Sequence, residues 1–170
     1  ARLIYRPRDG DRVEVHGSIG VYEAGGQYQL YAEWIQAAGE GDLFRQFTEL
    51  KARLETEGLF DPGRKRSIPA RPHRAAVVTS PTGAALRDML NIIRRRWPSL
   101  EVILCPAAVQ GEDAPAQIVR AIAAANELAA APDVIIVARG GGSIEDLWAF
   151  NDESVVRAIA ASAVPVISGV

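Results

Sequence analysis

The chain has 170 residues, of which 48% are hydrophobic and 24% are charged, and its formal net charge is −2 at pH 7. This length suffices for a buried core, and the composition is that of an ordinary soluble globular protein. The near-neutral balance provides no overall attraction to nucleic acid or to a membrane surface. The single cysteine, Cys105, excludes an intramolecular disulfide, and its place in the apolar stretch EVILC favours a core residue over a nucleophile.

Residues 1–38 predict antiparallel β-strands. The stretches ARLIYRP, DRVEVHGSIGVYE and QYQLYAEWI place apolar and β-branched residues near period two, with turns expected at RDGD and Ala24–Gly26. Three such strands make a poor independent core, so we expect them to complete a small barrel or sheet that begins upstream. The start at Ala1 without a methionine, and the end at PVISGV, likewise predict a fragment of a longer protein.

Residues 39–74 predict a helix followed by a basic linker. Between Gly41 and Gly58 apolar residues recur at helical spacing, and Gly58 suits a C-terminal cap. These apolar residues are Leu43, Phe44, Phe47, Leu50 and Leu54. The next stretch, LFDPGRKRSIPARPHR, is rich in proline and concentrates positive charge, including Arg64, Lys65 and Arg66. It is expected to be extended, and it could follow a polynucleotide backbone or serve as a solvated connector.

From residue 75 to residue 170 strand and helix patterns alternate. The predicted strands are AAVVT, EVILC, DVIIVA and VPVIS, and the predicted helices are 84–97, about 114–131 and 145–161. Each strand is apolar throughout, which is typical of parallel strands buried on both faces. The predicted fold class is therefore α/β, an open parallel sheet with crossover helices, preceded by a partial antiparallel β-domain and a linking helix.

Ligands of such sheets gather at the carboxyl ends of the strands, and the exit TSPTGAALRD carries suitable residues. It ends a strand on Thr79 and Ser80 and begins a helix at Thr82 and Gly83. Backbone N–H groups at this helix start, beside the hydroxyl side chains, would suit a phosphate oxygen. The alternative is a capped helix that carries Asp88 as a solvated aspartate.

A second strand exit, VARGGGSIED, places Arg139 before Gly140, Gly141 and Gly142, with Ser143 as a cap for the next helix. Glycine allows φ above zero and close approach of the backbone to a ligand, and successive N–H groups can then form an anion-binding nest. We therefore predict that the glycines make room for a phosphate and that Arg139 supplies its charge. The alternative is a tight turn with an incidental arginine. Neither exit has the glycine spacing of a dinucleotide fingerprint or the lysine of a P-loop.

Other residues stay open between a functional and a structural role. Trp148 and Phe150 could stack a nucleobase, although such aromatics more often pack a helix start onto its sheet. In VQGEDAP, Glu112 and Asp113 could help to hold a divalent ion, but Asp113 also suits the N-cap of the next helix. The two histidines have no partners at ligand spacing, so no metal site is predicted.

Together these stretches resemble the large subunit of bacterial exodeoxyribonuclease VII over nearly the whole chain. They include VVTSPTGAALRDML, PAAVQGEDAPAQIVRAI and the long, highly specific VIIVARGGGSIEDLWAFNDESVVRAIAASAVPVISGV. The resemblance implies that residues 1–38 are the second half of an OB-fold that binds single strands and that residues 39–74 connect it to a catalytic domain. It implies that residues 75–170 are the first part of that α/β domain, and that a later helical region recruits several copies of a small subunit.

The resemblance also implies roles for particular residues. The family's catalytic aspartate, in the motif T-G-A-A-x-x-D, falls on Asp88, and its catalytic arginine, in R-G-G-G-S, falls on Arg139. Family members continue with A-V-G-H-E-T-D, whose histidine and aspartate complete the site, whereas this chain has Gly169 where alanine is usual and ends at Val170. A fragment without these two groups is expected to be inactive. The residues expected to contact phosphate or DNA are Thr79, Ser80, Thr82, Gly83, Gly140, Gly141, Gly142, Ser143, Arg64, Lys65 and Arg66.

The expected function is that of an exonuclease subunit that degrades single-stranded DNA from both ends to oligonucleotides and nucleoside 5′-phosphates. No cofactor is expected to be required, and Mg²⁺ is expected at most to stimulate the reaction. The expected partners are single-stranded DNA and the small subunit, with no membrane, in the cytoplasm. The alternatives are a non-catalytic module that binds single-stranded DNA, which suits the fragment itself, and an enzyme that uses a small phosphorylated ligand.

Overall fold

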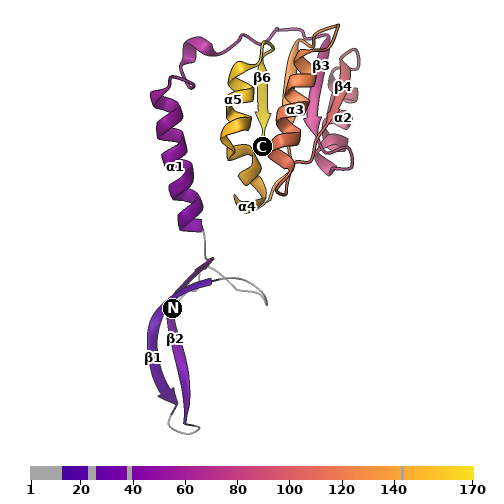
Figure 1. Ribbon diagram of the computed structural model, residues 1–170. Coiled ribbons are helices and arrows are strands. Elements are labelled where there is room, and N and C mark those ends of the chain that lie inside the picture. Colours follow the sequence, from indigo (N-terminus) through magenta and orange to yellow (C-terminus); the bar gives the residue numbers. More distant parts are fainter. Residues whose placement is uncertain (1–12, 23–25, 38–39, 143) are drawn as a thin grey trace. The chain divides into compact units, whose positions relative to one another are not determined.

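The protein is represented by a computed structural model that describes residues 13–22, 26–37, 40–142 and 144–170. Its internal contacts divide it into two units, Ala1–Glu49 and Leu50–Val170 (Figure 1). The expected strand ARLIYRP, the turn RDGD and the candidate residue Ser143 lie outside the described residues.

The first unit contains an antiparallel pair of strands, as the alternating pattern predicts. β1 (Val13–Tyr22) pairs with β2 (Gln27–Ala37), and the N–H of Gly26 donates to the carbonyl of Tyr22 at 2.8 Å to close the turn. Gly26 has φ of +61°, a conformation that favours glycine. Tyr28 is 83% exposed, because two strands cannot enclose a core by themselves. This pair is the partial, OB-like part of the fold.

Helix α1 (Glu40–Thr56) follows the predicted apolar spacing and ends before the predicted glycine. Gly58 has φ of +73°, and the N–H of Leu59 donates to the carbonyl of Leu54 at 3.0 Å across the helix end. Leu54 is fully buried, whereas Phe44 near the other end of the helix is 64% exposed. Only the carboxyl-terminal part of the predicted apolar face is therefore covered.

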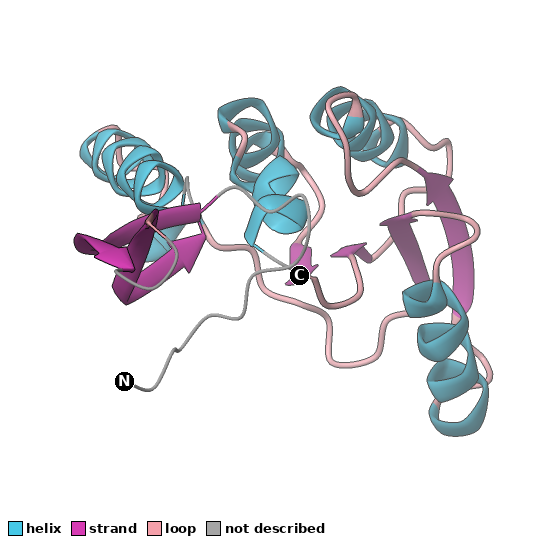
Figure 2. Cartoon of the chain, turned by 90° about the horizontal axis from the view of Figure 1, so that it is seen from below, coloured by secondary structure: helices cyan, strands magenta, loops and turns pink. Residues whose placement is uncertain are grey.

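The second unit is an α/β structure built on a four-stranded parallel sheet of order β4-β3-β5-β6. Its strands are β3 (Arg74–Thr79), β4 (Glu101–Pro106), β5 (Val134–Ala138) and β6 (Val166–Gly169). Its main helices are α2 (Ala84–Arg96), α3 (Ala114–Asn126) and α5 (Glu153–Ala161). Helices α3 and α5 lie on one face of the sheet and α2 lies on the other (Figure 2). The predicted α/β class, with a parallel sheet and crossover helices, is confirmed. Within the described ranges, no helix is long and apolar enough to cross a membrane.

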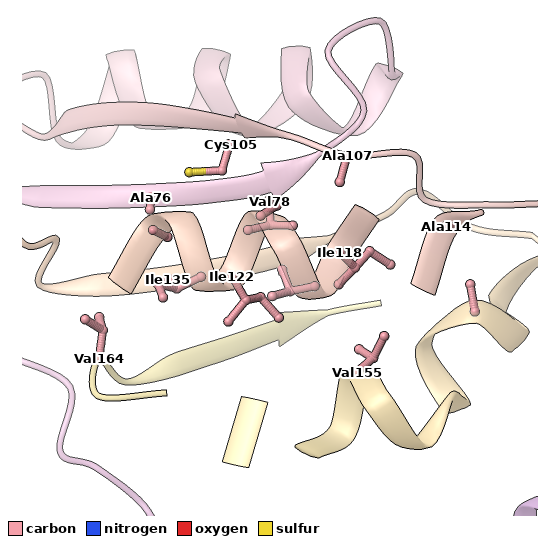
Figure 3. Close-up of a cluster of buried hydrophobic side chains, with 14 residues drawn as sticks. Ala76, Val78, Cys105, Ala107, Ala114, Ile118, Ile122, Ile135, Val155 and Val164 are labelled. Atoms are coloured by element: carbon pink, nitrogen blue, oxygen red, sulfur yellow. The ribbon is translucent and has the colours of Figure 1, made fainter. Parts of the chain in front are cut away.

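Helix α3 supplies the centre of the core. Its buried residues recur at helical spacing and are Ala114, Ile118, Ala121, Ile122 and Ala125. They belong to one cluster with Val78 of β3, Ile135 of β5 and Val155 of α5 (Figure 3). Cys105 of β4 lies in the same cluster, and burial raises the pKa of its thiol. The prediction that this cysteine is a core residue is confirmed.

The prediction that every strand is buried on both faces is wrong for the two edge strands. β3 and β5 are almost entirely buried, but Leu104 of β4 is 38% exposed and Ile167 of β6 is 36% exposed. An edge strand has a neighbouring strand on one side only, so fewer residues cover its side chains. The apolar sequence of an edge strand is therefore no measure of its burial.

The predicted helix at 145–161 is wrong as a single element. The chain forms α4 (Ile144–Leu147), a 3₁₀ turn η2 (Trp148–Asn151) and then α5. Asp152 breaks the helix because its backbone is extended, and its carboxylate accepts the N–H of Ser154 at 2.8 Å as an N-cap.

The predicted extension of the preceding helix to about residue 131 is also wrong, because α3 ends at Asn126. The Oδ1 of this residue accepts the N–H of Ala163 at 2.8 Å and the hydroxyl of Ser162 at 3.1 Å. Asn126 therefore ties the end of α3 to the segment that enters β6, a contact that helical periodicity does not reveal.

Candidate functional site

A cavity of about 380 Å³ opens at the carboxyl ends of the sheet strands. It is lined by the end of β3 and by the segments that follow three strands. These contribute Thr79 at the end of β3, Ser80, Gly83, Ala84 and Ala85 after β3, Ala108, Val109 and Gln110 after β4, and Arg139, Gly140 and Gly141 after β5. In the sheet, β4 lies on one side of β3 and β5 lies on the other side of β3. The carboxyl edge between β3 and β5 is thus a topological switch point, where open α/β sheets bind ligands.

The start of α2 forms one wall of the cavity. Its N-cap position is Gly83, which has no side chain to cap the helix, and the N–H of Gly83 donates to the carbonyl of Ser80 at 3.2 Å. Ala84 and Ala85 of the first turn line the cavity with small side chains. The predicted alternative of a helix start capped by its own hydroxyl residues is therefore not observed. The N–H groups of a first turn carry partial positive charge and suit an anion.

Arg139 forms the opposite wall. Its side chain is 8% exposed, and its Nη2 donates to Oε1 of Gln110 at 3.1 Å and lies 3.4 Å from Oδ2 of Asp146. Its Nη1 is buried and has no hydrogen-bond partner among the residues that the structure describes. A buried donor without an acceptor is destabilising, so this nitrogen marks a place where a ligand atom would be stabilising.

The backbone at the three glycines after Arg139 differs from the left-handed conformation that the sequence allows, whereas their contact with a phosphate stays a prediction. None of them has a positive φ, so the expectation of a left-handed nest at Gly140–Gly142 is wrong. A Cβ atom at Gly140 or Gly141 would meet nothing within 4 Å. One at Gly142 would meet Nη1 of Arg139 first and would lie 2.7 Å from its Nη2 and 2.9 Å from its Cζ. Gly142 therefore makes room for the guanidinium of Arg139, and Gly140 and Gly141 keep the cavity wall free of side chains.

Asp88 and Thr82 are not among the residues that line the cavity. Asp88 is exposed on α2, three and four positions beyond Ala85 and Ala84, so it lies about one turn farther along the same helix face. Thr82 is exposed, and its hydroxyl lies 3.3 Å from that of Ser80. Of the predicted site residues, the structure thus brings together Thr79, Ser80, Gly83, Arg139, Gly140 and Gly141.

The basic residues of the linker lie at a different cavity. Arg64, Lys65 and Arg66 help to line a space of about 470 Å³ together with residues of α5 and of the segment entering β6. The Nε of Arg66 donates to the carbonyl of Ser162 at 2.7 Å. The predicted linker is therefore packed onto the second unit at the amino end of β6, whereas the cavity of Arg139 lies at the carboxyl ends.

For the aromatic and acidic residues near the third cavity, the sequence left both a structural and a functional role open. Phe150 packs against the core cluster, whereas Trp148 lines a third cavity of about 410 Å³ together with Glu112. Asp113 occupies the N-cap position of α3, but its side chain makes no capping hydrogen bond. Across the described ranges, no group of three His, Cys, Asp or Glu residues could hold a metal ion.

Gln110 is the site residue that sequence reasoning missed. It follows β4 in the stretch VQGEDAP, for which the sequence suggested metal binding or capping of the next helix. Its position directly after a strand could have predicted that Gln110 lies at the site, because the carboxyl ends of neighbouring parallel strands meet at one edge of the sheet. Its contact with Arg139, 29 positions away in sequence, depends on the order of the strands.

Comparison with known proteins identifies the family of the chain. The family model described as exonuclease VII, large subunit, matches residues 59–170. Relatives named exodeoxyribonuclease 7 large subunit include those of Hahella chejuensis, 56% identical over 97% of this chain and 37% of the relative, and Stenotrophomonas maltophilia, 56% identical over 99% and 38%. That of Cronobacter sakazakii is 54% identical over 99% of this chain and 37% of the relative. This chain thus spans little more than a third of the length of these relatives, and it belongs to the exonuclease VII large-subunit family.

Proposed function

We propose that this chain is part of an exonuclease that hydrolyses single-stranded DNA, and that the cavity between the ends of β3 and β5 holds the scissile phosphate. The observation that carries the proposal is the buried Nη1 of Arg139, which lacks an acceptor among the described residues, in a cavity whose other wall is a helix start. Both features favour an anion. The names of the relatives supply the reaction class, since they are exodeoxyribonucleases.

In the proposed mechanism, the phosphate oxygens accept hydrogen bonds from the first turn of α2 and from Arg139. The negative charge of a pentacovalent transition state is greater at these oxygens than that of the ground state, so a fixed guanidinium stabilises the transition state selectively. Asp88, one turn along the same face of α2, orients the attacking water or the substrate. Arg139 takes the role that a divalent ion has in many phosphodiesterases, so no divalent ion is required and Mg²⁺ at most stimulates hydrolysis.

The proposed assembly contains the complete chain and several copies of the small subunit, in the cytoplasm. Arg64, Lys65 and Arg66 would contact the DNA backbone away from the scissile phosphate, because they lie at the other cavity. The partial OB-like strands would hold unpaired bases on their exposed aromatic residues, of which Tyr28 is the most exposed.

The test is hydrolysis of single-stranded DNA in excess EDTA by the complete chain assembled with its small subunit. Substrates carry a label at the 5′ end or at the 3′ end, and an Arg139→Ala assembly is run in parallel. We expect release of short oligonucleotides from both labels by the parent and loss of this release in the variant. DNA binding without hydrolysis, also after addition of Mg²⁺, would instead establish a single-strand-binding module. If mononucleotides inhibit the enzyme and short DNA does not, the substrate would be a small phosphorylated molecule rather than DNA.

A further inference from the structure

We infer that Gln110 and Gly142 are positioning residues for Arg139, which they hold so that its Nη1 is left for a phosphate oxygen of the substrate. The inference rests on the proposed function for the identity of the ligand. Gln110 and Gly142 lie against Arg139 and affect the ligand only through the position of its guanidinium.

Gln110 holds the guanidinium from a neighbouring strand exit. Its Oε1 accepts from Nη2 of Arg139 at 3.1 Å, and Asp146 approaches the same nitrogen at 3.4 Å. Both acceptors engage the same arm of the guanidinium fork, and because the group is planar, its other arm is fixed in direction as well.

The charge of these partners supports the same reading. The amide of Gln110 fixes the guanidinium without neutralising it, and the carboxylate of Asp146 is 48% exposed, so water weakens its attraction to the cation. The positive potential of Arg139 is therefore only partly cancelled, on a side chain that is only 8% exposed and lines the cavity. A cation in this position strengthens binding of an anion because the surroundings are less polar than water.

Gly142 sets the position of the guanidinium from the other side. A methyl group at this residue would meet Nη1 of Arg139 first, and it would lie 2.7 Å from Nη2 and 2.9 Å from Cζ, closer than carbon and nitrogen atoms approach without displacement. Arg139 is long and flexible, so it would move rather than the backbone. An alanine here would shift the guanidinium away from the place that Gln110 sets.

Positioning of this kind matters because stabilisation of a transition state depends on distance. A displacement of about 1 Å between a fixed charge and the reacting phosphate can lower a rate by about a hundredfold. Nη1 lies against Gly142, since it is the atom nearest to where a Cβ of that residue would be, whereas Gly140 and Gly141 have open space where a Cβ would be. A modest shift of this backbone would admit a phosphate oxygen to Nη1.

The experiment measures binding of inorganic phosphate to the complete chain by ³¹P NMR titration, which requires no catalysis. Gln110→Met removes the acceptor at nearly constant volume and charge, and Gly142→Ala displaces the guanidinium by contact. We expect each to weaken phosphate binding roughly tenfold, as the loss of one hydrogen bond to a charged group does. Gly169→Ala is the matched control, since its Cβ would meet Ala138 at an ordinary 3.6 Å.

A double-mutant cycle separates positioning from a general structural role. In an Arg139→Ala background, Gln110→Met should weaken phosphate binding no further, because its effect passes through the missing guanidinium. Equal weakening in both backgrounds would overturn the inference, as would phosphate binding by Gln110→Met and Gly142→Ala as tight as that of the parent. Failure of the parent to bind phosphate would overturn it too. If Gly142→Ala does not fold, Gln110→Met alone decides.

DNA hydrolysis by the same proteins distinguishes this inference from the proposed function. Weakened phosphate binding in both variants, with no hydrolysis of DNA by the parent, would uphold the positioning role and overturn the nuclease proposal. Hydrolysis by the parent, with unchanged rates and phosphate affinities in both variants, would uphold the nuclease proposal and overturn the positioning role.

Discussion

Two arginines at opposite ends of the sheet have very different surroundings. Arg74 begins β3 at the amino end, and its Nε and Nη1 donate to Glu101 at 2.9 Å and to the carbonyl of Ala130 at 3.0 Å. Its Nη2 lies 2.8 Å from the same carboxylate. Arg139 follows β5 at the carboxyl end and is 8% exposed against 28% for Arg74, yet its Nη1 has no acceptor in the described part of the chain. The more deeply buried cation is thus the less satisfied one.

This difference indicates what each end of the sheet is for. At the amino end, protein groups satisfy one another, as when the carboxylate of Asp133 accepts the N–H groups of His73 and Arg74 at 2.7 Å and 2.9 Å. At the carboxyl end, a helix start and a guanidinium face a cavity. Unmatched donors destabilise a protein alone and stabilise its complex with an anion. Substitutions at the amino end should therefore lower mainly the stability of the fold, and substitutions at the carboxyl end should lower mainly the activity.

The largest expected effect is at Arg139. Arg139→Ala should lower kcat/KM for single-stranded DNA by about 10²–10³-fold, because one fixed donor to the transition state is lost. It should leave the melting temperature equal or higher, since it also removes a buried donor that lacks an acceptor. Calorimetry and end-label assays on the same preparation measure both quantities. A marked fall in melting temperature would show that Arg139 is structural like Arg74, and the comparison between the two ends would fail.

The next effect is at the amino end of β6. Asn126→Ala removes the acceptor of the Ala163 N–H and one of the two acceptors of the Ser162 hydroxyl, which also donates to the carbonyl of Val164 at 2.7 Å. The free energy of unfolding should therefore fall by about 1–3 kcal/mol. Hydrolysis per folded molecule should change little, because the scissile phosphate is proposed to lie at the opposite, carboxyl end of the sheet. Asn126→Asp, which keeps Oδ1, is the matched control. In a urea titration it should lower the free energy of unfolding by less than Asn126→Ala does. An equal loss in both variants would contradict the role of Oδ1.

A smaller effect is expected at Arg74. Arg74→Ala should lower the free energy of unfolding by at most about 1 kcal/mol, since its ion pair with Glu101 is partly solvated. It should not alter phosphate affinity. Arg71→Ala, at an exposed side chain of the same linker, provides the reference. A loss of phosphate affinity in Arg74→Ala would mean that the two ends of the sheet are coupled.

The smallest expected effect is a dependence of folding stability on pH at Asp133. Backbone hydrogen bonds from Arg74 and His73 lower the pKa of Asp133 below its ordinary value of about 4. A carboxyl group with a lowered pKa in the folded state adds stability above its ordinary pKa and loses it as the pH falls through the folded value. The stability difference between the parent and Asp133→Asn should therefore be present at pH 7 and shrink below pH 4, as thermal unfolding across this range would measure. A constant difference would show that the charge of Asp133 does not matter.

Local rules predicted much of this molecule. Gly58 ends its helix and Gly26 its turn because few other residues tolerate positive φ. The helix break at Asp152 was missed because the apolar spacing continues through it, and a capping aspartate competes with that spacing only by a local hydrogen bond. The exposure of Leu104 was missed because burial depends on which strand lies at an edge.

For the candidate site, the sequence alone determined which residue types follow the strands, and hence that hydroxyls, glycines and an arginine reach the carboxyl edge of a parallel sheet. Only the tertiary structure decided that β3 lies between β4 and β5, which brings Gln110 to Arg139 and leaves Asp88 outside the cavity lining. It also decided that Gly142 serves to fit a guanidinium rather than a left-handed backbone. The physical reason is that backbone conformation and apolar period are local properties, whereas strand order and the satisfaction of a buried charge depend on segments far apart in sequence.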